Sequence, residues 1–275
     1  MNIDIFCGGR EIAATARKVR VEYEGAIYHV INRGDRREDI FRDDRDRERF
    51  LETLEETCGK TSWQVHAYCL MRNHFHVVVE TPRANLSAGM HWLLGTYTAR
   101  FNRRHRVVGH LFSGRYKALL VDGSGSGYLK GVCDYVHLNP VRAKLLRPEQ
   151  RLRAFRWSSY PEYLKTGRRR PGWLRVDRLL GEWGIQRDSA TGRRRFEEGM
   201  ERRKGQEMEQ EDTSWDELRR AWCWGEAEFR DGVLELIEQE RAEHHYGEEI
   251  VKSVERETER LLRDMIKEIG WTERT

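Results

Sequence analysis

The stretch NHFHVVVETP, residues 73–82, begins with two histidines and runs on into consecutive valines. Successive side chains of a β-strand point to opposite faces of the sheet. His74 and His76 therefore share one face of the predicted strand. Phe75 and Val77 begin the other face, which has the apolar character of a protein core. The strand thus presents a core on one side and two converging imidazoles on the other.

The segments around this strand alternate between strand and helix patterns. Predicted strands cover residues 25–34, 63–72, 74–80 and 114–122, and predicted helices cover residues 43–60, 85–106 and 128–138. Asn85 stands where the second helix would be N-capped. The order β-α-β-β-α-β-α contains two β-α-β units around a central hairpin. We therefore predict an α+β fold with a ferredoxin-like, split β-α-β, four-stranded antiparallel sheet. Helices would cover one face, leaving the other for a ligand or a further helix.

The rest of the chain differs in composition from this predicted sheet domain. We expect four parts: a flexible basic N-terminal arm (1–20), the sheet domain (21–150), a Trp- and Arg-rich extension that wraps it (151–185), and an acidic helical C-terminal region (186–275). Within the last part, residues 248–270 carry an apolar stripe at helical spacing.

Charge is distributed unevenly along the 275 residues. The net charge is only +4, yet residues 81–170 contain 18 lysines and arginines against 4 aspartates and glutamates. Such a basic segment is typical of a protein that binds a polyanion, although a solvated basic surface is the simpler alternative. Arginine dominates, and its forked guanidinium suits phosphate.

Compartment and membrane association are predicted from cysteines and hydropathy. Five cysteines occur without a C-x-x-C pair, which fits reduced thiols and a cytoplasmic location. No apolar run approaches the roughly 18 residues needed to span a bilayer. We expect neither a signal peptide nor a membrane partner.

The two histidines have the spacing of a metal-ligand pair. Their Cα atoms would lie roughly 6.6–7 Å apart, so both imidazoles could bind one ion. Imidazoles without cysteine suit Mn²⁺, Zn²⁺ or Co²⁺, and Mg²⁺ where oxygen donors complete the shell. Paired strand histidines are often structural, however, so this spacing alone leaves a packing role open.

The segment CDYVHLNPVRA, residues 133–143, adds a potential nucleophile. Tyr135 and Asn139 are four residues apart and would share a helix face. A tyrosine hydroxyl attacks effectively when a metal or cation stabilises the phenolate, and an amide oxygen can complete the metal shell. Two structural alternatives stay open: Tyr135 as a core-edge aromatic, and Asn139 as an N-cap before Pro140.

Four segments in this order, GAIYHVINRGDRREDIFRDD, AYCLMRNHFHVVVETP, LFSGRYKALLVD and CDYVHLNPVRA, resemble the IS200-like HUH tyrosine transposases. The resemblance is closer still to the REP-associated tyrosine transposases, and it runs from about residue 17 to residue 174. It implies that residues 21–150 form an HUH catalytic domain. It also implies that His74, His76 and Asn139 bind a divalent metal, Mg²⁺ or Mn²⁺, with Tyr135 as nucleophile.

The resemblance implies a metal-dependent nuclease and strand transferase acting on single-stranded DNA with hairpin or palindromic elements. Cleavage would pass through a 5′-phosphotyrosine. For the DNA-binding surface, charge and aromaticity favour the following residues: Arg33, Arg103, Arg104, Arg115, Lys117, Arg142, Lys144 and Trp157. His29 and His137 are expected to be packed imidazoles rather than ligands.

Three other functions remain possible from the sequence. A domesticated relative would bind DNA hairpins as a regulator without cutting, but it would not need an intact His74, His76 and Tyr135. A rolling-circle-type nickase shares the chemistry, although the compact fold favours the transposase. An RNA-binding ferredoxin-like domain would carry a pair of aromatic side chains on its strands for base stacking. The predicted strands lack this pair, which disfavours RNA binding. We expect a monomer rather than a homodimer.

Overall fold

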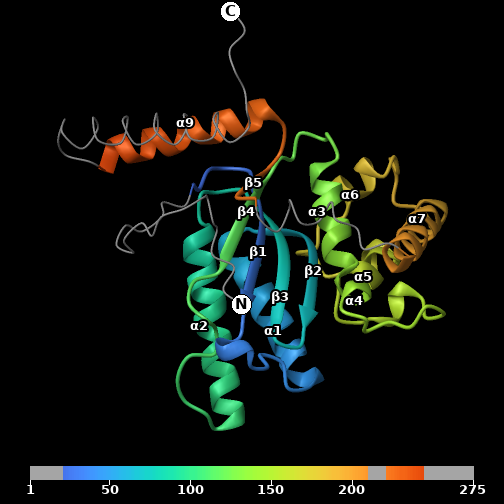
Figure 1. Ribbon diagram of the computed structural model, residues 1–275, viewed down its shortest axis with the longest axis horizontal. Helices are drawn as coiled ribbons and strands as arrows, with labels where there is room; N and C mark the ends of the chain where they lie inside the picture. The colour runs from blue at the N-terminus through green and yellow to red at the C-terminus, as the bar shows by residue number, and fades with distance from the viewer. Residues whose placement is uncertain (1–20, 210–220, 245–275) are drawn as a thin grey trace, which may run out of the picture. The chain divides into compact units, whose positions relative to one another are not determined.

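The computed structural model describes residues 21–209 and 221–244 (Figure 1). The predicted N-terminal arm and the apolar stripe of residues 248–270 lie outside these residues. The chain divides into two compact units, residues 1–9 with 22–226 and residues 10–21 with 227–275. Of the second, the main described element is helix α9 (Ala227–His244). No helix in the described ranges is long and apolar enough to cross a membrane.

A mixed sheet forms the centre of the first unit. Its strands are β1 (Ala26–Arg33), β2 (Gln64–Met71), β3 (His74–Thr81), β4 (Lys117–Val121) and β5 (Cys223–Trp224), in the order β2-β3-β1-β4-β5. The first four pair antiparallel, in the order expected of two split β-α-β units. The predicted α+β sheet is therefore confirmed. The two residues of β5 add a parallel pairing at the β4 edge, which the sequence did not predict.

Two long helices cover one face of the sheet, as Figure 1 shows: α1 (Asp44–Thr61) and α2 (Leu86–His105). Helix α1 begins where the Asp43 carboxylate accepts a hydrogen bond from the backbone N–H of Asp46, a side-chain N-cap. The Phe50 ring packs 4.9 Å from Phe75 and 5.1 Å from Tyr97. This aromatic core lies on the Phe75 face of β3, as the alternation predicts.

Asn85 precedes α2 but does not cap it with its side chain. Its amide oxygen accepts from Trp63 Nε1 at 2.8 Å, and its amide nitrogen donates to the Thr61 carbonyl at 3.0 Å. Asn85 is thus the N-cap residue, as predicted, but its side chain does not cap the helix, because tertiary partners occupy both amide atoms. The residue ties the start of α2 to the connection between α1 and β2.

The opposite face of the sheet carries helix α3 (Tyr128–His137), the further helix that the open face allowed. The Tyr135 ring of α3 contacts the His76 ring of β3, which fixes α3 on the histidine face. A short helix α4 (Asn139–Arg142) follows directly. Both histidines and the tyrosine are thus brought to one side of the sheet by the strand alternation and the packing of α3.

The segment after α4 follows the edge of β2. The backbone N–H of Leu70 donates to the Trp157 carbonyl, and those of Ser159 and Arg175 donate to Tyr68 and Val65. These bonds cover the β2 edge, which would otherwise be open to pairing with another chain. The short elements along this path are η2 (Leu152–Ala154), α5 (Tyr160–Tyr163), η3 (Gly167–Arg169) and α6 (Asp177–Glu182); η1 (Asp35–Arg37) lies earlier, after β1.

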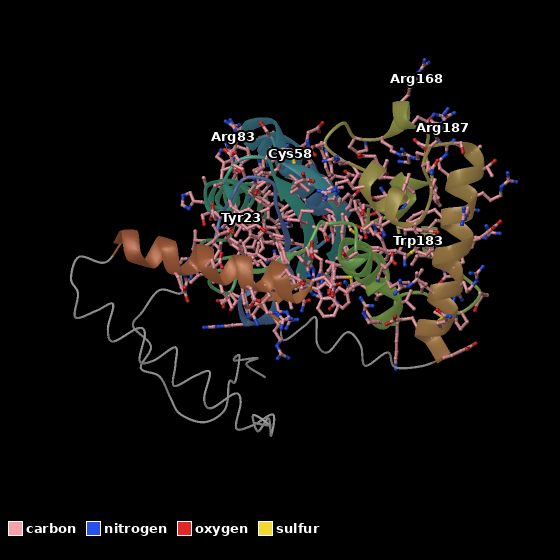
Figure 2. The ribbon with its side chains drawn as sticks, turned by 90° about the horizontal axis from the view of Figure 1, so that it is seen from above. Tyr23, Cys58, Arg83, Arg168, Trp183 and Arg187 are labelled. Atoms are coloured by element: carbon pink, nitrogen blue, oxygen red, sulfur yellow. The ribbon has the colours of Figure 1, made fainter. Side chains whose placement is uncertain are left out.

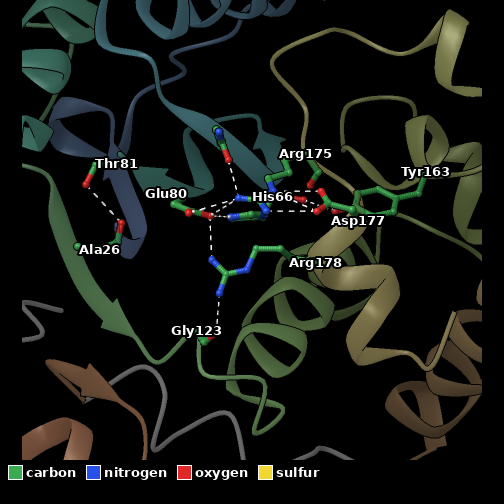
Figure 3. A network of polar contacts seen from close by, with 10 residues as sticks. Ala26, His66, Glu80, Thr81, Gly123, Tyr163, Arg175, Asp177 and Arg178 are labelled. Atoms are coloured by element: carbon green, nitrogen blue, oxygen red, sulfur yellow. Dashed lines mark hydrogen bonds and ion pairs between the residues drawn. The ribbon is translucent and has the colours of Figure 1, made fainter. Parts of the chain in front are cut away.

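Glu80, at the far end of the histidine face, anchors this wrapping segment (Figure 3). Its carboxylate accepts hydrogen bonds from His66 at 2.9 Å, Arg178 at 2.9 Å and Arg175 at 3.2 Å. Burial opposes ionisation, but the hydrogen bonds from His66 and Arg178 prevail and lower the pKa of Glu80 to about 2. The carboxylate is therefore charged at neutral pH and holds two arginines of the extension.

Helix α7 (Ala190–Glu209) packs on the outer side of α3 and α6. The Trp183 ring, labelled in Figure 2, lies between α3 and α7: its Nε1 donates to Asp134 at 3.3 Å, and its ring meets Phe196 at 5.5 Å. His137 also faces this cluster, 5.3 Å from the Tyr163 ring, and its Nε2 is 2.8 Å from Ser159 Oγ. The prediction that His137 is a packed imidazole agrees with these contacts.

Candidate active site

Four aromatic rings meet on the histidine face of the sheet. The ring centroid of His76 lies 5.1 Å from that of His74, 5.2 Å from His29 and 5.9 Å from Tyr135. The Tyr135 ring is also 5.7 Å from His29. The strand alternation thus places His74 and His76 together, and α3 adds the tyrosine from another part of the chain.

His29 is the residue that the sequence reasoning missed. Its Nε2 lies 3.0 Å from Nδ1 of His76, so one ring donates a hydrogen bond to the other. In the tautomer in which His76 Nδ1 donates this bond, its Nε2 is free to bind a metal, and His29 holds the His76 ring in that orientation. The register of β1 against β3, which pairs Ile31 with His76, brings His29 onto this face.

Burial keeps the imidazoles neutral, the form that ligates metals. It lowers the pKa of His74 to about 4, with a further contribution from Arg33. It lowers the pKa of His29 to about 3, helped by the charge of Arg142. The pKa of His76 also lies well below its ordinary value, because of burial first and then of the neighbouring His29 and His74.

The backbone and ring of Tyr135 are held from the side of α4. The Asn139 amide nitrogen donates to the Tyr135 carbonyl at 3.3 Å. Arg142 donates to the same carbonyl and places its Cζ atom 4.0 Å from the centroid of the Tyr135 ring. The guanidinium therefore covers one face of the phenol, while the two histidine rings meet it edge-on. Only 5% of the Tyr135 surface is exposed.

The donor set fits a divalent ion bound by nitrogen and oxygen. Within residues 21–209 and 221–244, no group of three or more His, Cys, Asp and Glu side chains could hold a metal. A third protein ligand beside His74 and His76 would then be of another type, and Asn139 is the one that the sequence predicts. Its amide nitrogen donates to the Tyr135 carbonyl, so the amide oxygen is the atom that would serve as ligand. The packing alternative, Asn139 as N-cap, is wrong: it is the first residue of α4.

Some of the proposed DNA-binding residues lie beside this cluster. Arg33 pairs across the sheet with His74, and Lys117 pairs with Ile31, so both share the histidine face, and both are exposed. Arg142 lies on the Tyr135 ring. Arg115 and Lys144 are exposed near β4 and after α4. Arg33, Lys117 and Arg142 thus lie on the side of the rings, whereas Arg115 and Lys144 are two residues from Lys117 and Arg142 along the chain.

Three other proposed DNA-binding residues lie elsewhere. Arg103 and Arg104 end α2, on the opposite face of the sheet. The Arg104 guanidinium is bound by Asp43 and Asp46. Trp157 lies at the β2 edge, is 9% exposed, and has guanidinium carbons near its ring: Arg156 at 4.5 Å and Arg47 at 5.4 Å. These residues do not join the ring cluster.

Comparisons with known proteins concern the segment that carries the four rings. Residues 22–139 match the family model described as "Transposase IS200 like". This segment is therefore similar to the IS200-like transposases. The match ends at Asn139 and includes all four rings of the cluster. The resemblance predicted from the sequence is thereby confirmed for this family.

One solved structure is similar to the chain at 12% sequence identity, with a TM-score of 0.45. It is described as a REP-associated tyrosine transposase bound to a REP hairpin, and the similarity covers 59% of this chain and 92% of that one. Among curated proteins, none matches the sequence. Residues 140–275, which include helices α5, α6, α7 and α9, lie beyond the transposase domain match.

Proposed function

We propose that this protein is an HUH-type tyrosine transposase that cleaves and rejoins single-stranded DNA. The observation that supports this most directly is the contact of the Tyr135 ring with the His76 ring, from a helix and a strand 59 positions apart in the chain. A nucleophile beside a pair of neutral imidazoles is the arrangement that metal-assisted phosphoryl transfer requires. The DNA substrate carries a hairpin, as the resemblance to REP-associated enzymes implies.

The chain supplies both the nucleophile and the ligands. His74, His76 and Asn139 hold the divalent cation, Mg²⁺ or Mn²⁺, and His29 orients His76. When bound, the ion supplies Lewis-acid polarisation of the scissile phosphate. The Tyr135 phenol oxygen forms a bond to phosphorus while the bond from phosphorus to the 3′ oxygen breaks. The phenol proton is released, and the 3′ oxygen takes up a proton and leaves as a hydroxyl.

The products of this step are a 5′-phosphotyrosine and a free 3′-OH, so the number of phosphoester bonds is unchanged. Attack of a 3′-OH on the phosphotyrosine reverses the exchange and joins strands. The DNA backbone is bound by five cations on or near the histidine face: Arg33, Arg115, Lys117, Arg142 and Lys144. Trp157, Arg103 and Arg104 are assigned to contacts farther from the cleavage site.

A labelled hairpin oligonucleotide tests the proposal. The protein is incubated with the oligonucleotide and Mn²⁺, and the products are separated on a denaturing gel. We expect a covalent adduct that disappears in Tyr135→Phe and in the double variant His74→Ala/His76→Ala. Cleavage that persists in Tyr135→Phe would contradict the assignment of the nucleophile.

A second candidate function is a hairpin-binding regulator that does not cleave. The low exposure of Tyr135, 5%, favours it, because a nucleophile must reach the phosphate. Tight hairpin binding without an adduct across a panel of hairpins and both metals would select this function. The protein would then use the same cations to bind DNA while the phenol stays covered.

A further inference from the structure

Arg142 joins the nucleophile to a helix outside the transposase domain match. Its guanidinium lies 4.0 Å from the Tyr135 ring centroid and donates to the Tyr135 carbonyl. On its other side, Nη1 donates to Oε1 of Glu207 at 3.1 Å. Glu207 belongs to α7, near its C-terminal end, whereas the match ends at Asn139. A chain of direct contacts therefore runs from α7 to the phenol.

This ion pair is shielded from water. The side chain of Arg142 is 14% exposed and that of Glu207 is 5% exposed. Removing one member of a buried pair leaves the other charge uncompensated, at a much larger cost than for a surface pair. The Glu207 carboxylate therefore helps to hold the guanidinium in its place against the Tyr135 ring.

The position of Arg142 determines how the Tyr135 ring is held. The ring is confined between the guanidinium on its face and the edges of His29 and His76. Loss of the guanidinium removes the contact on the face of the ring and allows the phenol to rotate away from the imidazoles. Because attack needs the phenol oxygen aligned with the phosphorus, a loosely held ring reacts less often.

We propose that Glu207, acting through Arg142, is a positioning residue for Tyr135, so that α7 is part of the machinery that orients the nucleophile. This inference rests on the proposed cleavage function and assigns to it a residue outside the transposase domain match. Glu207 touches neither DNA nor the reacting atoms in this assignment. Its effect reaches the phenol through the guanidinium.

The test compares Glu207→Gln with a matched control on the same helix. Glu197 also lies on α7 and pairs with Arg151 at 3.3 Å and Arg153 at 3.4 Å, away from the ring cluster. Glu197→Gln therefore removes one charge and its two arginine pairs from α7 without touching Arg142. Both variants are made in the full chain and compared for single-turnover adduct formation and hairpin Kd.

We expect Glu207→Gln to slow single-turnover adduct formation by about tenfold or more while the hairpin Kd stays within about twofold. Glu197→Gln should match the wild type. In an Arg142→Gln background, Glu207→Gln should have no further effect, because both substitutions break the same chain of contacts. Equal rates for Glu207→Gln and Glu197→Gln, a faster Glu207→Gln, or independent additive effects would each overturn the proposal.

A second measurement works even if the protein does not cleave DNA. The tyrosines are labelled with ¹³C at Cζ, and the Tyr135 signal is assigned by its absence in Tyr135→Phe. We expect Glu207→Gln to shift this signal and Glu197→Gln to leave it in place. An unmoved signal overturns the positioning role, whereas a shifted signal without any adduct contradicts only the cleavage function. If Glu207→Gln does not fold, Arg142→Lys, which keeps the charge but not the planar fork, replaces it in both measurements.

Discussion

The His76 ring contacts the other three rings of the cluster, and its hydrogen-bond partner there is another histidine, His29. Since His29 fixes which nitrogen of His76 faces the ion, its loss should weaken metal binding without removing a ligand. We predict that His29→Phe lowers the affinity for Mn²⁺ by roughly 10- to 100-fold, measured by calorimetry. His91→Gln, an exposed histidine of α2, is the control and should bind as the wild type does. Unchanged affinity in His29→Phe would contradict this role.

At the scale of single residues, the sequence predicted contacts between residues that are close to one another along the chain. His74 and His76 are two apart on one strand, so simple periodicity places them together. Tyr135 and Asn139 lie in successive helices, α3 and α4, and a hydrogen bond from the Asn139 amide to the Tyr135 carbonyl joins them. His29 was not predicted, because its place depends on the register of β1 against β3. That register comes from side-chain packing across the sheet, which no spacing along one strand reveals.

At the scale of the elements, helix α2 packs closely against the Trp63 side chain at Gly89. A Cβ atom there would lie 2.1 Å from Cζ2 of Trp63, whereas Gly95 on the same helix has open space around it. We predict that Gly89→Ala destabilises the fold by about 1–3 kcal/mol, because the indole must move. Gly95→Ala should stabilise it by roughly 0.5–1 kcal/mol through helix propensity. Urea unfolding of both variants checks this, and equal effects would contradict the packing described.

The Glu80 network predicts how stability depends on pH. The folded pKa of Glu80, about 2, lies below its ordinary value, so the stabilisation is complete above about pH 4.5 and is lost as pH falls toward 2. Glu80→Gln should therefore lower Tm by a few degrees at pH 7, and the difference from wild type should shrink at pH 3. A difference that is constant between the two pH values would show that the charge is not involved.

The helices and strands were predicted more completely than the tertiary contacts between them. The four strands of the split β-α-β sheet and the helices α1, α2 and α3 begin and end within about three residues of the predicted bounds, since each has a clear period and flanking turn residues. Strand β5 was not predicted, because two residues carry no period and their pairing depends on β4. Asn85 occupies the predicted N-cap position, but its side chain bonds Trp63 and Thr61 instead of the helix, which the local sequence does not show.

For the whole molecule, the distribution of charge predicts the salt dependence of DNA binding. Each cation that contacts a phosphate releases counterions, so log Kd should rise linearly with log salt. We predict that Lys117→Ala lowers this slope by about 1. Arg49→Ala is the control, because Arg49 lies on α1 across the sheet and pairs with Glu52 at 2.8 Å. Filter binding at several salt concentrations measures both, and equal slopes for Lys117→Ala and wild type would remove Lys117 from the DNA surface.

The arrangement of the sheet edges bears on assembly. Within the described residues, the segment around Trp157 and Arg175 covers the β2 edge, and Cys223–Trp224 pairs with β4. Covered edges disfavour joining two sheets side by side, which agrees with the monomer expected from the sequence. That expectation stays a prediction.

The central claim is that Tyr135 becomes covalently joined to DNA. Mass spectrometry of the protein digested after incubation with a hairpin oligonucleotide and Mn²⁺ tests it directly. The account predicts a nucleotide mass on the peptide that contains Tyr135, attached through a 5′ phosphate, with the released fragment ending in a 3′-OH. Attachment to a different tyrosine, or cleaved DNA with a 3′ phosphate and an unmodified Tyr135, would contradict it.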